Sequence, residues 1–128
     1  MRLLLDTHTL FWALVEPALL SADARRAIEA PPSDVYVSTA SAWEMAIKVG
    51  IGKWPEAAAL VDQFEERLDP VGFRTLPITV MHARSAGLLR SPHRDPFDRL
   101  LIAQATIEDL TLVTADPKLV GLGAEVLW

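Results

Sequence analysis

The sequence predicts an α/β fold, a three-layer α/β/α sandwich with a central, mostly parallel sheet. Short apolar runs alternate with longer helical patterns along the chain, and this alternation is typical of repeated βαβ units. The runs are almost continuously apolar, as expected for strands that helices cover on both faces. With 51% hydrophobic residues in a length of 128, the chain suits one domain over residues 1–128 with a full core.

The first half of the chain contains two of these strands. Leu3–Leu5 is the first apolar run, and Val35–Val37 is the second, after a loop at Pro31-Pro32-Ser33. Both runs have the length and composition of buried strands. Helical patterns at Thr9–Val15 and Ala22–Ala30 lie between them, so these segments form the first βαβ unit.

The rest of the chain continues the alternation. A strand is expected where a short apolar run is bounded by turn residues, and a helix where a longer patterned segment separates two runs. A loop at Ser91-Pro92-His93 separates the last two helices. The expected helices are Ala42–Val49, Glu56–Leu68, Thr79–Leu88 and Pro96–Glu108, and the expected strands are Phe73–Leu76, Leu110–Val113 and, at the sheet edge, Glu125–Leu127.

Composition excludes several classes of protein. The chain has no cysteine, which rules out disulfides, thiolate zinc sites and thiol nucleophiles. A formal net charge of −5 argues against nucleic-acid binding by bulk positive charge, unless divalent cations supply that charge at the site. No segment resembles a signal peptide or has the length of a membrane span, so we expect no membrane association and a cytoplasmic protein.

Four acidic residues lie at the ends of predicted elements. Asp6 directly follows the first strand, and Asp116 comes just after the Leu110–Val113 strand. Glu44 opens the helix after the second strand, and Asp98 opens the helix that leads into Leu110–Val113. Because ligands of open parallel sheets bind beyond the carboxyl ends of the strands, we expect these carboxylates to converge on one edge of the sheet.

Three of these acids also have a structural interpretation. Asp6 could end a strand and begin a turn. Glu44 fits a capping box with Ser41, in which its side chain reaches back to the backbone N–H of Ser41. Asp116 precedes Pro117, as the N-cap of a short helix would. Each pattern taken singly is therefore compatible with a purely structural role.

Asp95 and Asp98 lie close together and have to be distinguished. Asp95 precedes Pro96, which is the pattern of an N-cap at the start of the last long helix. Asp98 would then be the third helical residue, where a carboxylate also suits the helix dipole. We interpret Asp95 as mainly structural and Asp98 as mainly functional.

As a set, the four acids favour a metal site. Carboxylates that face one point repel one another and raise one another's pKa values unless a cation lies among them. Hard carboxylate oxygens without clustered His or Cys suit Mg²⁺ or Mn²⁺ rather than zinc. The histidines, His8, His82 and His93, show no zinc-ligand spacing, and we expect them at the surface or as caps.

Seven segments, spread over nearly the whole chain, match one family in order. They are Leu4-Leu5-Asp6-Thr7-His8, Ser41–Lys48, Gly52-Lys53, His93–Arg99, Leu101–Ala105, Leu112–Asp116 and, at the end, Val126-Leu127-Trp128. Through them the sequence resembles the PIN-domain toxins of bacterial and archaeal toxin–antitoxin operons, the VapC family. The resemblance implies a PIN fold and an Mg²⁺- or Mn²⁺-dependent endoribonuclease that hydrolyses RNA with a metal-activated water.

The resemblance also assigns residues. It places the acidic quartet of the family, for catalysis and metal binding, on Asp6, Glu44, Asp98 and Asp116. Thr114 occupies the place of a hydroxyl that is usual near the last acid, and Thr7 and Asp95 are secondary candidates. Candidates for contacts with RNA phosphates are Lys48, Arg94 and Arg99, each of which is equally compatible with a solvated or ion-paired surface position.

The resemblance further implies a homodimer and a cognate antitoxin whose C-terminal segment lies across the toxin. It implies RNA products with 5′-phosphate and 3′-hydroxyl ends. The alternative from another class of function is a non-catalytic PIN-fold interaction module that binds a partner protein or RNA.

Two other enzyme classes would need different residues. A haloacid-dehalogenase-type phosphatase requires a second Asp where His8 stands. A phosphorelay receiver domain requires paired acids before the end of the first strand and a lysine after a late strand. Neither pattern is present.

Overall fold

Five parallel strands form one sheet in the computed structural model, which describes residues 1–128. The sheet order is β3-β2-β1-β4-β5, and every pair of neighbours is parallel. β1 is central, so that Leu4 pairs with Tyr36 on one side and with Leu112 on the other. The strands are β1 (Arg2–Leu5), β2 (Asp34–Ser38), β3 (Arg74–Leu76), β4 (Thr111–Val113) and β5 (Val126–Leu127).

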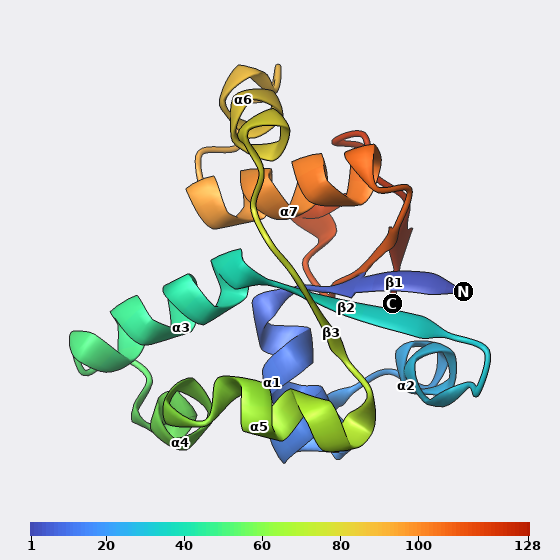
Figure 1. Cartoon of the computed structure of the whole chain (residues 1–128). Helices are drawn as coiled ribbons and strands as arrows, with labels where there is room; N and C mark the ends of the chain where they lie inside the picture. Colours follow the sequence, from blue (N-terminus) through green and yellow to red (C-terminus); the bar gives the residue numbers. More distant parts are fainter.

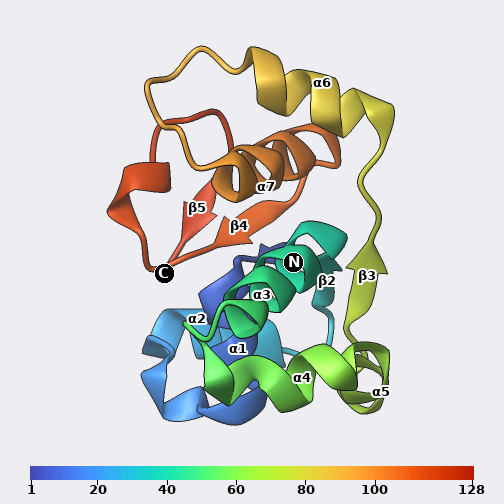
Figure 2. The ribbon, with the colours of Figure 1, turned by 90° about the vertical axis from the view of Figure 1, so that its left-hand side faces the viewer.

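Helices cover both faces of this sheet. Figure 1 shows α6 and α7 above the sheet and α1 to α5 below it, and Figure 2 shows the same division from the side. The helices are α1 (Thr7–Val15), α2 (Ala22–Glu29), α3 (Thr39–Gly50), α4 (Ala58–Asp62), α5 (Phe64–Leu68), α6 (Val80–Leu88) and α7 (Pro96–Ile107), with single 3₁₀ turns at Pro17–Leu19, Pro55–Ala57, Asp69–Val71 and Pro117–Leu119. The predicted α/β/α sandwich is confirmed. None of the helices has the length and apolar character needed to cross a bilayer.

The alternation of side chains along β1 divides the core in two. Leu3 and Leu5 belong to a large cluster between the sheet and the α1–α5 layer, whereas Leu4 packs with Leu101 of α7 and Leu112 of β4. The three leucines of β1 are fully buried, and each such burial contributes about 1.5–3 kcal/mol. Both core clusters therefore hold β1 in place, and they also fix the position of Asp6, which follows the strand.

The order of the strands reverses beside β1. The chain proceeds from β1 outward to β2 and β3, and then α6 and α7 carry it back to β4 on the other side of β1. In parallel α/β sheets, such a reversal opens a crevice at the carboxyl ends of the two strands. Asp6 follows β1 at this point, and its backbone N–H donates to the carbonyl of Val113, at the end of β4 (3.0 Å).

Three predicted helices differ from the structure by more than one residue, and one of them is α3, which begins at Thr39 rather than Ala42. α1 begins at Thr7 rather than Thr9, because the Asp6 side chain caps it. The segment Glu56–Leu68 is interrupted at Gln63 (φ −119°, ψ 42°), which separates α4 from α5. The buried residues Ala57, Leu60, Phe64 and Leu68 keep a helical spacing across this break, so periodicity alone could not reveal it.

Candidate active site at the carboxyl ends of the strands

A polar pocket of about 170 Å³ lies at the reversal point of the sheet. No hydrophobic residue lines it, and Lys48 is the only lysine or arginine in the lining. The structure thus brings all four predicted acids together, with Asp95 as a fifth. The pocket is lined by Asp6, Thr7, His8, Glu44, Lys48, Asp95, Asp98 and Asp116.

Asp6 enters the pocket as the N-cap of α1. Its Oδ1 accepts the backbone N–H of Thr9 at 2.7 Å, which satisfies one of the unpaired N–H groups at the helix start. No side chain or backbone group hydrogen-bonds to its Oδ2. The structural and functional interpretations of Asp6 are therefore compatible, because the two oxygens have different surroundings.

Glu44 lies in the helix rather than at its start, which corrects the capping box expected with Ser41. α3 begins at Thr39, and the Ser38 hydroxyl caps it by accepting the Ala40 N–H (2.9 Å). Glu44 is buried one turn further on, where the Thr7 hydroxyl donates to its Oε1 (2.7 Å).

Lys48 donates to the other oxygen of Glu44, Oε2, at 2.9 Å. Both oxygens of this carboxylate are therefore occupied by side-chain donors. Such hydrogen bonds offset the cost of burying a carboxylate.

Asp95 and Asp98 meet the pocket from the start of α7. Asp95 caps the helix, since its Oδ1 accepts the backbone N–H groups of Phe97 (2.9 Å) and Asp98 (3.1 Å). The predicted N-cap is thus confirmed. Asp98 is the third helical residue, as expected, and its Oδ2 lies 2.8 Å from Nε2 of His93.

The pKa of Asp98 is raised above its ordinary value of 3.8. Burial is the main cause, because it disfavours the charged form, and the negative charges of Asp95 and Glu44 add to it. The hydrogen bond and positive charge offered by His93 act in the opposite direction without cancelling the effect. Ionised Asp98 is therefore destabilising in the folded protein.

This raised pKa predicts a pH-dependent gain in stability for Asp98→Asn. The folded protein holds a proton at Asp98 more tightly than the unfolded chain does. As pH rises from 3.8 through the raised pKa, the free energy of unfolding therefore falls. In EDTA at neutral pH, we expect a higher melting temperature for Asp98→Asn than for wild type, with a gain that shrinks as the pH falls toward 3.8. A melting temperature equal to or below that of wild type at pH 7 would contradict this.

Asp116 reaches the pocket from the turn after β4. It caps the Pro117–Leu119 turn, as predicted, because its Oδ1 accepts the backbone N–H of Lys118 (2.9 Å). The Thr114 hydroxyl, which is buried, accepts the backbone N–H of Asp116 (3.1 Å). Thr114 therefore fixes the backbone that carries Asp116, and it does not line the pocket itself.

The three aspartates Asp6, Asp98 and Asp116 share one feature. In each, the protein holds one carboxylate oxygen by a hydrogen bond, whereas the other oxygen has no partner within the chain. Glu44 is the exception, with both oxygens held. The side chains as they stand do not bring three His, Asp or Glu residues within reach of a single ion.

The three basic candidates have different surroundings. Lys48 is in the pocket, whereas Arg94 is exposed and makes no ion pair. Arg99 donates all five of its N–H groups to backbone carbonyls, those of Ala86, Gly87, Leu89, Ser91 and His93. The expectation that Arg99 contacts phosphate is therefore corrected: it fixes the loop before α7 and has no donor left.

The histidines, expected at the surface or as caps, agree with this in part: His8 is exposed and His82 is a cap, but all three also contact acidic residues or the acidic pocket. His8 lines the pocket, and His93 contacts Asp98. His82 does cap a helix, through Thr79, but it is 1% exposed and its Nε2 also bonds to Glu108 (2.9 Å). The place of His8 in the sequence could have indicated that it lines the pocket, because His8 lies in the first turn of the helix that Asp6 caps.

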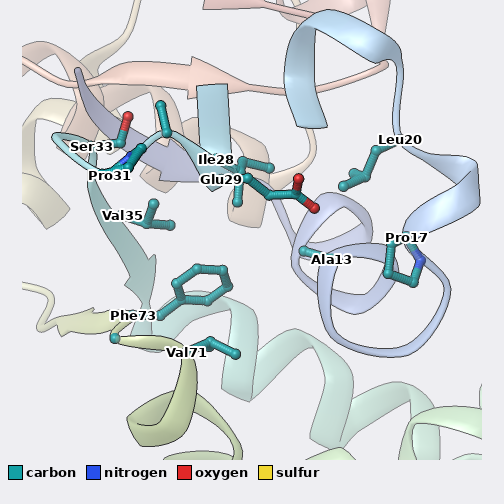
Figure 3. Close-up of a pocket in the computed structure, with 12 residues that line it drawn as sticks. Ala13, Pro17, Leu20, Ile28, Glu29, Pro31, Ser33, Val35, Val71 and Phe73 are labelled. Atoms are coloured by element: carbon teal, nitrogen blue, oxygen red, sulfur yellow. The ribbon is translucent and has the colours of Figure 1, made fainter. Parts of the chain in front are cut away.

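Two larger hollows, each of about 380 Å³, lie elsewhere. Figure 3 shows the first, where the apolar side chains of Val35, Ile28 and Phe73 lie around a space that Glu29 and Ser33 also line. Val35 lies near the amino end of β2, opposite the end at which the acids gather. The second hollow shares Asp116 with the acidic pocket and extends to Trp128.

Comparison with solved structures shows the same fold in three proteins. VapBC2 from Rickettsia felis, bound to a DNA fragment from its promoter, gives a TM-score of 0.71 at 17% identity, over 99% of this chain and 98% of that chain. A toxin–antitoxin complex from Klebsiella pneumoniae gives 0.66 at 20% identity, over 98% and 96%. FitAcB from Neisseria gonorrhoeae gives 0.62 at 22% identity, over 100% and 97%.

Sequence comparison identifies the family. No curated protein matches the chain. The family model that does match is that of the PIN domain, and it covers residues 3–124, which includes every acid in the pocket. The chain therefore belongs to the PIN domain family.

Proposed function

We propose that this protein is a metal-dependent endoribonuclease and the toxin of a toxin–antitoxin pair. The observation that carries the nuclease proposal is the pocket at the sheet reversal, which five carboxylates line without a single hydrophobic residue. Solved structures of the same fold include toxin–antitoxin complexes, which supports the biological role.

The pocket fits a hard divalent cation such as Mg²⁺ or Mn²⁺. Its donors are carboxylate and hydroxyl oxygens, which these ions prefer. A volume of about 170 Å³ leaves room for an ion with several of its waters, each of which occupies about 30 Å³. The residues that would hold the ion, directly or through its waters, are Asp6, Asp98 and Asp116, with the oxygens that the protein leaves free.

When bound, such an ion lowers the pKa of water and offsets charge on the phosphodiester. Glu44, which the sequence predicted as a further ligand, has both oxygens held by side chains, so we assign it a supporting role instead. Thr7 and Lys48 fix the Glu44 carboxylate, so we assign Glu44 to orienting water or holding Lys48. Lys48 is half-exposed and is the cation in this pocket that can meet a phosphate.

The partners that we propose are an RNA substrate, a cognate antitoxin and a second copy of the chain. α6 carries large apolar side chains that are exposed, namely Val80, Met81 and Leu88. Apolar residues that gather on one exposed element are typical of surfaces that bind other proteins. The acidic lining of the pocket also suits a partner segment that carries arginine.

Purified protein and labelled single-stranded RNA test the enzymatic proposal. With Mg²⁺ or Mn²⁺ we expect endonucleolytic cleavage that leaves 5′-phosphate ends, and with EDTA no cleavage. The melting temperature should also rise with Mn²⁺, because an ion that binds only the folded state stabilises it. A rise in melting temperature without cleavage of any RNA would favour the non-catalytic interaction module instead.

A further inference from the structure

A row of aromatic rings borders the acidic pocket. His8 stacks on Trp54 with ring centroids 4.8 Å apart and an interplanar angle of 22°. His8 also approaches Trp12, in a tilted arrangement (5.9 Å, 52°), and Trp12 in turn approaches Trp128 (5.7 Å). The row therefore extends from the Lys48 side of the pocket to the hollow that Trp128 and Asp116 share.

His8 and Trp54 differ in how firmly they are held. Trp54 is half-buried and packs against the core, with Phe11 at 5.0 Å and the Lys48 Nζ at 5.7 Å from its ring. His8 is exposed and lies in the pocket lining. The half-buried tryptophan thus supports a solvent-exposed ring beside the carboxylates. Core packing accounts for the position of Trp54 but not for the exposure of His8.

The net charge of the protein indicates how an exposed ring at His8 could contribute to RNA binding. The chain carries a net charge of −5, only one lysine lines the pocket, and Arg99 has no free donor. Phosphate contacts by basic residues, which normally supply most of the affinity for nucleic acid, are therefore few. Stacking of a base on an aromatic ring is an alternative that does not depend on charge.

We propose that the His8–Trp54 stack binds an unpaired nucleobase next to the phosphodiester held at the acidic pocket. This rests on the proposed ribonuclease function and specifies its substrate as single-stranded RNA. A base in a duplex has both faces covered by its neighbours, whereas an unpaired base can be splayed out onto an aromatic ring. Purines offer more stacking area than pyrimidines, so the site should prefer adenine to uracil.

Binding of short RNAs tests this proposal. Fluorescein-labelled ten-nucleotide oligoadenylate, oligouridylate and an RNA duplex are titrated with the whole chain by fluorescence anisotropy. Ca²⁺ replaces Mg²⁺, since it takes the same kind of oxygen ligands, and a gel confirms that the RNA stays intact. We expect oligoadenylate to bind more tightly than oligouridylate, and the duplex more weakly than either.

Substitutions of His8 and Trp54 then test whether these two rings cause the preference for adenine. His8→Leu removes the ring but keeps an apolar side chain, and we expect oligoadenylate binding to weaken on the order of tenfold and the adenine preference to disappear. His8→Phe keeps a ring and should retain both. Trp54→Leu should behave like His8→Leu, after a melting curve has confirmed folding. Trp43→Leu is the matched control, because Trp43 is exposed and lies outside the pocket lining.

The outcomes separate this inference from the function on which it rests. Metal-dependent cleavage of RNA, together with unchanged affinity and preference in His8→Leu, would overturn the stacking site and leave the nuclease intact. Duplex binding as tight as that of oligoadenylate would also overturn it. If wild type neither cleaves nor binds any of the three RNAs, both proposals fail.

Discussion

The variant Asp6→Asn is expected to fold like wild type and to cleave RNA on the order of a hundredfold to a thousandfold more slowly. Asparagine is as good an N-cap as aspartate, so its amide oxygen can still accept the Thr9 N–H and α1 should keep its start. The substitution removes the negative charge and the free oxygen that face the pocket. It therefore separates the capping role of Asp6 from its proposed role in metal binding.

Single-turnover cleavage in Mg²⁺ measures the loss, and a melting curve in EDTA measures folding. Asp62→Asn is the matched control, since Asp62 is exposed on α4 and lies outside the pocket lining. Cleavage by Asp6→Asn at the wild-type rate, with an unchanged melting curve, would show that Asp6 serves only as a cap. Loss of cleavage together with a collapsed melting temperature would instead indicate that the charge is needed for folding.

The strands could be predicted closely because burial on both faces leaves a direct mark on the sequence. The run Leu3–Leu5 and the run Val35–Val37 each lie within the observed strand. Helix starts were harder to predict, because they depend on which side chain caps the first turn. Ser38 caps α3, and nothing in the spacing of Ser41 and Glu44 reveals that an earlier serine does so.

The gathering of the acids could also be predicted, since residues that follow parallel strands meet at one edge of the sheet. What each acid contacts could not. The role of Arg99 depends on the path of a loop in which three carbonyls, those of Leu89, Ser91 and His93, accept from one guanidinium. The stack of His8 on Trp54 joins two positions far apart in the sequence, and no spacing along the chain indicates it.

The second large expected effect is a difference in RNA cleavage between Asp95→Asn and Asp98→Asn, which tests which of the two aspartates is a metal ligand. Asp95 uses one oxygen for two backbone N–H groups at the start of α7, and asparagine can accept both. We expect Asp95→Asn to cleave RNA within a few-fold of the wild-type rate. The substitution removes a charge that raises the pKa of Asp98, so Asp98 should ionise more readily in this variant.

Asp98→Asn should have the opposite profile, with higher stability in EDTA and on the order of a hundredfold slower cleavage. Burial makes the negative charge of Asp98 unfavourable in the folded protein without metal. A bound cation would stabilise this charge, because a nearby positive charge favours the ionised form of a carboxyl group. Mn²⁺ titration by calorimetry provides a readout independent of cleavage, and we expect weaker binding to Asp98→Asn than to Asp95→Asn. If Asp95→Asn binds Mn²⁺ more weakly and loses cleavage while Asp98→Asn retains both, Asp95 is the ligand and Asp98 is not.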